Sequence, residues 1–188
     1  MNQADKKEFE ITDLVLQLSR AAYAQSNGDG LTQAQWVAMY FFSRANRFSR
    51  TVSGFARFHV TTKGTASQTV KTLVQHEYLA RSVSDRDARS IRFDLTAAGR
   101  KKLKQNPLAR LVQVAAALQE ADKQHVLTGL RTMFTDIYAD ATETEADVCQ
   151  LCGHLDKGSA SSGPRCKLMN ETLREAELTE VCVRFKRA

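Results

Sequence analysis

A mainly α-helical fold with one small β-hairpin is predicted by three observations on this 188-residue sequence. Apolar residues recur at helical spacing in several long segments, and only two prolines, Pro107 and Pro164, interrupt the chain. Two short segments that alternate apolar and polar residues flank a charged turn, as the strands of a hairpin do. Hydrophobic residues make up 43% of the chain, which is enough for a packed core.

The first half of the chain shows the patterns of four helices. An amphipathic stretch is ended by the turn-rich letters SNGDG at 26–30. Thr32 and Thr62 stand just before two later apolar patterns, in the position of N-caps. The aromatic residues that follow Trp36 are expected to face the core. The helices are predicted at 6–25, 32–44, 51–58 and 62–76.

The hairpin and the remaining helices are predicted after residue 77. Alternating apolar residues on both sides of the charged letters SDRDAR at 84–89 indicate two strands and their turn. Thr96 is placed to cap a long helix that Pro107 should bend. The strands are predicted at 78–83 and 90–95, and the helices at 96–118, 121–139 and, in the tail, from Cys166 through Leu178.

This order of helices, hairpin and helix is typical of a winged helix-turn-helix. The flanking helices carry more apolar surface than such a small module buries, so a helical homodimer body is expected. No apolar run reaches membrane length and no signal peptide is visible, which predicts a cytoplasmic protein. The predicted parts are dimerisation helices at 1–30 and 104–141, a DNA-binding domain at 31–103, and a cysteine-rich metal-binding tail at 142–188.

Positive charge is concentrated in one third of the chain. Between Arg44 and Lys104 there are fourteen Lys/Arg and four Asp/Glu, a net charge of +10, whereas the rest of the chain sums to −4. Nine of the fourteen are arginines, whose planar fork suits phosphate. Such a patch predicts nucleic-acid binding through counterion release, with a merely solvated surface as the alternative.

The charged turn and the residues after it carry a spaced motif: Asp87-Ala88-Arg89, then Leu95-Thr96 and Gly99. This motif resembles the D-x-R…L-T-x-x-G signature of the MarR family of transcription regulators, and the likeness extends over about residues 8–140. The resemblance implies a small-molecule pocket between the dimer body and the DNA-binding lobe. Trp36, Tyr40 and Arg44 could border that pocket, although core packing explains the aromatic residues equally well.

The predicted helix at 62–76 is the element expected to read DNA, because a helix fits the major groove with its first turns facing the base edges. Gln68 is the best candidate for base readout, since its amide can donate to and accept from adenine. Lys63 and Lys71 are expected to bind phosphate or guanine. The polar residues expected to face DNA are Thr62, Lys63, Thr65, Ser67, Gln68 and Lys71.

The turn of the wing is the second expected DNA contact. Arg86 and Arg89 on a thin ribbon could enter the minor groove, with Asp87 orienting Arg89, although an ordinary salt-bridged turn is the alternative. Two such modules in a two-fold dimer would read a near-palindromic operator of roughly 16–20 base pairs. At the end of the wing's preceding helix, Glu77 stands where the MarR family usually has a glycine C-cap.

All four cysteines of the chain lie in its last forty residues, at Cys149, Cys152, Cys166 and Cys182. In a reducing compartment this clustering predicts four thiolate ligands to a metal rather than disulfides. An iron–sulfur cluster is slightly favoured over Zn²⁺, because only one Cys-x-x-Cys knuckle is present. A metal-free disulfide switch between Cys149 and Cys152 stays open as a third reading.

The expected function is that of a dimeric, sequence-specific DNA-binding regulator, a repressor controlled by a small ligand or by the metal- or redox-sensing tail. The alternative is a cytosolic thiol-redox or metal-handling protein that acts through the CQLC letters at 149–152. We expect no enzyme, because the sequence shows neither a phosphate-cradling glycine loop nor a nucleophile elbow.

Overall fold

A computed structural model describes residues 3–24, 30–83, 91–137, 146–159 and 163–187. The helices are α1 (Gln3–Ala24), α2 (Gln33–Arg44), α3 (Val52–Phe58), α4 (Lys63–Gln75), α5 (Ala97–Leu103), α6 (Leu108–Ala117) and α7 (Glu120–Ile137). The wing strands are β1 (Leu79–Val83) and β2 (Ile91–Leu95). The tail contains β3 (Asp147–Val148), η1 (Cys149–Leu151), β4 (Leu155–Asp156), β5 (Arg165–Cys166), β6 (Glu171–Thr172), η2 (Glu175–Thr179) and β7 (Val181–Cys182).

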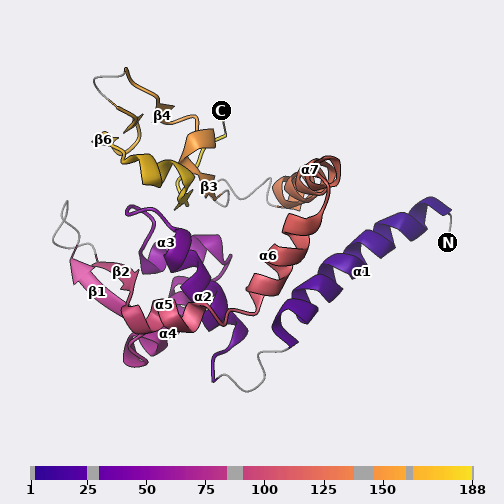
Figure 1. The fold of residues 1–188 in the computed structure, drawn as a ribbon, viewed down its shortest axis with the longest axis horizontal. Coiled ribbons are helices and arrows are strands. Elements are labelled where there is room, and N and C mark those ends of the chain that lie inside the picture. The colour runs from indigo at the N-terminus through magenta and orange to yellow at the C-terminus, as the bar shows by residue number, and fades with distance from the viewer. Residues whose placement is uncertain (1–2, 25–29, 84–90, 138–145, 160–162, 188) are drawn as a thin grey trace.

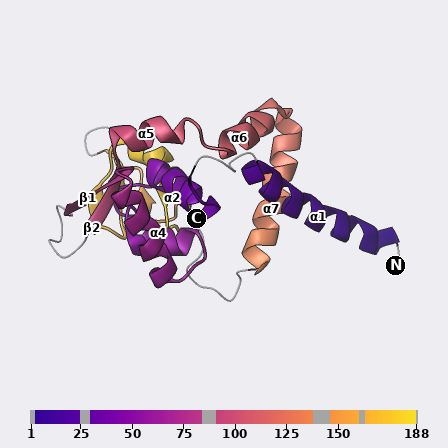
Figure 2. The same ribbon diagram turned by 90° about the horizontal axis from the view of Figure 1, so that it is seen from below.

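The elements fall into three groups in space. Helices α2 to α5 and the β1–β2 hairpin form the winged helix, while α1, α6 and α7 stand to one side of it (Figure 1). The tail lies on the winged helix on the side away from α4, as the view from below makes plain (Figure 2). No helix in the described segments is long and apolar enough to cross a membrane.

The core of the winged helix is aromatic, as the sequence predicts. Trp36 and Phe55 have no exposed surface, and Phe41 and Phe42 are almost as deeply buried. The Phe41 and Phe42 rings meet edge to face with centroids 5.2 Å apart, and Phe42 also contacts Phe93 of β2. Such pairs add about 0.5–1.5 kcal/mol each to the free energy gained by burying their area. This cluster joins α2 and α3 to the wing.

Threonine N-caps begin the helices of the winged helix, as predicted at Thr32, Thr62 and Thr96. Thr32 forms a full capping box, in which its side chain accepts from the Gln35 backbone N–H and the Gln35 side chain accepts from the Thr32 N–H. The predicted helix over 51–58 is capped by Thr51, whose hydroxyl accepts from the Gly54 N–H. Local capping chemistry therefore fixes where these helices start.

Helix α4 ends in a left-handed turn although the residue there is not glycine. Glu77 has φ of 58°, and the N–H groups of Glu77 and Tyr78 bond back to the carbonyls of Val74 and Leu73. This is the Schellman pattern. The helix therefore ends in the same way as it would with a glycine at this position. The left-handed backbone at Glu77 costs a residue with a Cβ about 1–2 kcal/mol.

The wing is a short antiparallel hairpin in which Leu79 pairs with Leu95 and Val83 with Ile91. Leu79, Leu95 and Phe93 are buried on its inner face. The turn residues 84–90, which include the predicted contacts Arg86, Asp87 and Arg89, lie outside the described residues.

Two predictions of helix are wrong. The long helix expected over 96–118 is broken into α5 and α6, because Pro107 lacks an N–H and the chain turns at the buried Asn106, whose side chain accepts from the Leu108 N–H. The helix expected from Cys166 through Leu178 is instead β5, a turn, β6 and the 3-10 helix η2. Pairing of β5 with β4 and β6 satisfies backbone groups that a helix would have bonded internally.

The residues of the Leu95-Thr96…Gly99 motif join the start of α5 to the end of α4 by hydrogen bonds and close backbone contact. The Thr96 hydroxyl accepts from the Gly99 N–H at 2.9 Å and donates to the Glu77 carbonyl at 2.6 Å. The Tyr78 carbonyl lies so close to Gly99 that a Cβ on residue 99 would overlap its oxygen. Glycine is therefore required here by backbone contact rather than by dihedral angle.

Substituting Gly99→Ala should destabilise the winged helix by about 1–3 kcal/mol, because the added methyl forces α5 and the Tyr78 backbone apart. Urea denaturation followed by circular dichroism measures the free energy of unfolding. Gly64→Ala is the matched control, since a Cβ there meets only the Thr62 hydroxyl at 3.8 Å. Equal stability of the two variants would contradict the close approach at Gly99.

Candidate nucleic-acid interface and cysteine-rich tail

Helix α4 presents one apolar face to the core and one polar face to solvent. Ala66, Val70 and Leu73 are buried against the rest of the winged helix. The polar residues predicted from the sequence to face DNA are all exposed: Thr62, Lys63, Thr65, Ser67, Gln68 and Lys71. Among the described residues these side chains and Gly64 form a continuous hydrophilic surface over the first turns of α4, which has no acidic residue in its first turn.

The first turn of α4 combines its cap with its polar surface. The Thr62 hydroxyl accepts from the Thr65 N–H at 3.1 Å and lies 2.9 Å from the Thr65 hydroxyl. The free N–H groups of a helix start carry partial positive charge, which favours a phosphate nearby. Lys63 adds a full positive charge at the same end. The arrangement suits a helix that enters a DNA groove by its N-terminus.

Part of the positive charge counted in the sequence is already neutralised inside the molecule. Arg47 pairs with Glu171 and Glu177 of the tail, at 3.5 and 3.4 Å. Arg50 pairs with Glu180 of the tail at 3.2 Å and with Asp94 of β2 at 2.7 Å. Sequence reasoning missed these pairs; the one available signal was the acidic composition of 171–180.

The three residues suggested for a ligand pocket differ in exposure. Trp36 is fully buried in the core, and Lys102 lies over its ring at 5.4 Å from the centroid. Tyr40 is half-buried and Arg44 is exposed, and the Arg44 guanidinium donates to the Tyr40 hydroxyl at 2.8 Å. Core packing therefore accounts for Trp36, and the Tyr40–Arg44 pair borders the solvent side of α2.

The four cysteines of the tail line one small cavity together with Asn46 and Phe48 of the winged helix. Cys149 and Cys182 are buried, whereas Cys152 and Cys166 are half-buried. Sheet pairing brings them together, because Cys166 lies opposite Leu155 and the Leu155 N–H bonds to the Cys152 carbonyl. The structure thus gathers all four residues that the sequence predicts as metal ligands.

These thiols surround the cavity without converging on one point. Within the described segments, no three His, Cys, Asp or Glu side chains are already arranged as ligands of one metal ion. The four cysteines are free thiols with no disulfide among them. The Cys149 thiol donates to Cys182 rather than to its sequence neighbour Cys152. His154, which stands two residues after Cys152 in the sequence, also lines the cavity.

Hydrogen bonds make Cys182 the more acidic thiol of the buried pair. Donation from Cys149 lowers the pKa of Cys182 to about 6 against the opposing effect of burial, with help from the Arg184 backbone N–H and the Asn46 and Ser49 side chains. The same Cys149–Cys182 contact, together with burial, raises the pKa of Cys149 above its ordinary value. The site therefore favours a thiolate at Cys182.

The tail is joined to the loop between α2 and α3 by both backbone and side-chain bonds. The Asn46 N–H donates to the Val181 carbonyl at 2.9 Å, and the Val183 N–H donates to the Ser49 hydroxyl at 3.1 Å. The buried Asn46 amide donates to the Cys149 sulfur at 3.3 Å, and its oxygen accepts from the Phe48 and Ser49 N–H groups. Residues 45–50 thus form the seat on which the tail rests.

The helix order, the two-stranded wing and the exposed N-terminal half of α4 define a winged-helix DNA-binding protein. Residues 29–90 match the family model described as the MarR family. No curated protein shows a significant sequence match to the chain. The family-model match confirms, for residues 29–90, the resemblance to the MarR family of transcription regulators that was noted at the wing motif.

Solved structures share the fold of this chain at low sequence identity. A MarR/EmrR family transcriptional regulator from Acinetobacter sp. ADP1 is 20% identical, with a TM-score of 0.56 over 73% of this chain and 98% of that one. MepR from S. aureus in complex with DNA is 15% identical, with a TM-score of 0.60 over 72% of this chain and 99% of that one. A second structure of S. aureus MepR, in a DNA-binding conformation, is 16% identical with a TM-score of 0.60, over 70% of this chain and 98% of that one.

Substituting Asn46→Ala should lower the free energy of unfolding by about 2–4 kcal/mol, because three hydrogen bonds of a buried amide, about 1 kcal/mol each, are lost and polar groups lose their partners. Thermal melting and limited proteolysis of the tail measure the effect. Gln150→Ala, an exposed amide within the cysteine knuckle, is the control and should melt like the unmodified protein. An unchanged melting temperature for Asn46→Ala would show that this amide does not hold the tail to the winged helix.

Proposed function

We propose that this protein is a homodimeric transcription repressor that binds a near-palindromic operator in double-stranded DNA through α4 and the wing. The observation that carries the proposal is the exposed polar face over the first turns of α4, which has Gln68 at its centre and lysines at both ends. A glutamine amide can recognise adenine by paired hydrogen bonds, while lysines neutralise phosphates on either side. The DNA complex of S. aureus MepR, which shares the fold, supports this use of the module.

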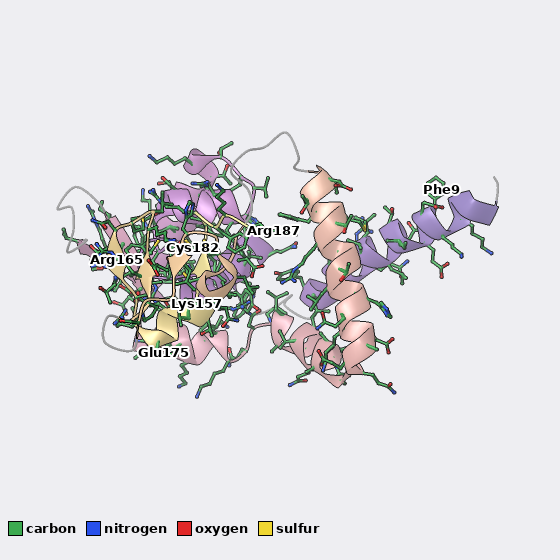
Figure 3. The ribbon with its side chains drawn as sticks, turned by 90° about the horizontal axis from the view of Figure 1, so that it is seen from above. Phe9, Lys157, Arg165, Glu175, Cys182 and Arg187 are labelled. Atoms are coloured by element: carbon green, nitrogen blue, oxygen red, sulfur yellow. The ribbon has the colours of Figure 1, made fainter. Side chains whose placement is uncertain are left out.

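The dimer is supported by apolar surface that the single chain leaves uncovered. Leu14 and Leu18 of α1 are 51% and 52% exposed, and Ile137 of α7 is 72% exposed. Phe9 projects from the free end of α1, far from the winged helix (Figure 3). A patch of this extent on three adjoining helices is a protein interface rather than a solvated surface. A second copy, related by a two-fold axis, would cover it and place two α4 helices on one face.

Repression follows from the shape of such a complex, because a dimer that covers a promoter excludes the polymerase unless a signal releases it. The signal would act through a small ligand near the Tyr40–Arg44 pair or through the cysteine-rich tail. The rival function, a thiol-redox or metal-handling protein, needs no DNA and predicts no specific binding at any salt concentration. Fluorescence anisotropy of the full chain with duplex DNA, at low and moderate salt, separates the two.

Substituting Gln68→Ala should weaken operator binding roughly 5- to 150-fold, the loss of about 1–3 kcal/mol expected for one bidentate base contact. The operator is one selected from a pool of random duplexes, and affinity is measured by anisotropy. Gln75→Ala, at the exposed far end of the same helix, serves as control and should bind like the unmodified protein. If the Gln68 variant keeps full affinity and base preference, α4 does not read bases through this residue.

Substituting Leu18→Lys should shift the dimer toward monomer, because it places a charge in the apolar stripe of α1. Light scattering after gel filtration, over a range of protein concentrations, gives the mass. Gln17→Lys introduces the same charge at the neighbouring polar position and should remain dimeric. An unmodified protein that is monomeric at every concentration would reject the proposed assembly.

A further inference from the structure

The tail separates its charges between an inner and an outer side. Among its described residues, four of the six acidic side chains are buried or half-buried, and each of these pairs with an arginine outside the tail: Asp147, Glu171, Glu177 and Glu180. The seven basic side chains of the same residues are all exposed. Five of them form what is here named the outer surface of the tail: Lys157, Arg165, Lys167, Arg184 and Lys186. This surface is basic although the tail as a whole is nearly neutral.

Pairing in the sheet β4–β5–β6 contributes to this separation. Cys166 of β5 lines the cavity, and Glu171, its partner on β6, reaches Arg47 of the winged helix. The side chains before and after Cys166, Arg165 and Lys167, are both exposed. Successive side chains of an extended chain point to opposite sides. One side of this segment therefore faces the winged helix with its thiol and carboxylate, and the other faces solvent with its cations.

Backbone hydrogen bonds bring the basic residues onto adjoining segments. The Lys167 N–H donates to the His154 carbonyl at 2.8 Å, and the Gly153 N–H donates to the Lys186 carbonyl at 2.7 Å. The segments that carry Lys167 and Lys186 thus both lie next to residues 153–154. Cations that are up to thirty positions apart in the sequence are thereby gathered on one small module.

The outer surface and α4 lie on opposite sides of the winged helix. Figure 3 looks down on the tail and shows Lys157, Arg165 and Arg187 spread across it. Figure 2 looks from below and shows α4 in front of the winged helix, with the tail behind it. A straight duplex held along α4 therefore does not reach the outer surface of the tail.

The chemistry of this surface suits a phosphate backbone. Exposed lysines and arginines neutralise closely spaced phosphates and release their counterions, and such contacts do not depend on base sequence. Arg165 adds the planar fork that fits a phosphate. In a complex with its operator, other segments of the same DNA molecule are present at high effective concentration. Duplex DNA is therefore the polyanion that this surface would meet first.

We propose that the outer surface of the tail binds the phosphate backbone of a second duplex segment, so that the operator-bound protein bridges two segments of DNA. Bridging rests on the proposed function, because α4 must hold the first duplex. Binding of duplex DNA by the tail does not rest on it. The acidic residues of the inner side make the arrangement possible, because they pair with arginines of the winged helix and α7 instead of neutralising the outer cations.

The first experiment isolates the tail surface on the full chain by disabling α4 with Lys63→Gln, Gln68→Ala and Lys71→Gln. Anisotropy with a duplex of random sequence, over a range of salt concentrations, gives the salt dependence of binding. Adding Arg165→Gln with Lys167→Gln should lower the slope of log affinity against log salt by about two, one for each phosphate contact. The charge-retaining exchange Arg165→Lys with Lys167→Arg should keep the slope, which separates loss of charge from a change in the fold.

A matched control removes the same charge elsewhere. Lys6→Gln with Lys7→Gln changes two exposed cations near the free end of α1, far from the tail, and should leave the slope unchanged. Equal slopes for the tail variant and this control would overturn duplex binding by the tail.

The second experiment measures bridging. Selected operator duplex is fixed to beads and saturated with protein that has an intact α4, and a labelled duplex of unrelated sequence is added. Unmodified protein should capture the second duplex. The variant Arg165→Gln with Lys167→Gln should hold the operator as before and bind the second duplex roughly 10- to 60-fold more weakly at about 0.1 M salt, because each lost phosphate contact costs up to about eightfold there.

The outcomes distinguish this inference from the proposed function. Operator-saturated protein that captures no second duplex, or a tail variant that captures it as well as the unmodified protein, would overturn bridging. Polyglutamate that displaces the second duplex at equal concentration of charge would reassign the surface to an acidic protein and overturn its role in DNA binding. If no operator can be selected through α4, the proposed function fails, while the salt dependence in the first experiment still decides whether the tail binds duplex DNA.

Discussion

One buried side chain, the amide of Asn46, is the constraint on which the rest of the structure depends. It has no exposed surface, and its oxygen shapes the turn that leads from α2 to α3 by accepting two backbone N–H groups. Its nitrogen donates to Cys149, and its backbone donates to the strand that carries Cys182. A buried amide must satisfy all its polar atoms, and Asn46 does so only when the tail is seated. The tail and the winged helix are therefore one packed unit at this point.

The salt bridges between residues 45–50 and the tail neutralise part of the positive charge in the basic third of the chain. Arg47 and Arg50 are paired with tail carboxylates and Asp94, on the side of the winged helix away from α4. The charge that remains for DNA is concentrated at Lys63, Lys71 and the other exposed cations of the winged helix. Acidic residues of the tail thus act as internal counterions, and a tail that leaves its seat would uncover arginines far from α4.

The likeness to the MarR family falls within the winged helix, whereas the four cysteines lie in the tail. The winged helix is of a kind found in MarR regulators, and the likeness to the family model ends at residue 90. The tail instead supplies a small cavity lined with thiols, and the Asn46 amide of the winged helix donates to one of them. In this arrangement a change at the cysteines has a short physical path to the wing, through Arg50 and the Phe93 backbone, which needs no movement of α4 itself.

Local chemistry determined the helices, because threonine caps, turn residues and apolar spacing act within a few residues of one another. The N-caps Thr32, Thr62 and Thr96 and the exposed face around Gln68 could therefore be predicted from the sequence. Only the tertiary structure decided the conformation of the tail. Its apolar and helix-forming residues from Cys166 onward form short strands, because β5 pairs with β4 and β6 pairs with β5. It also decided that Cys149 lies against Cys182 rather than Cys152, because contacts between residues more than thirty positions apart follow from packing and leave no mark on local pattern.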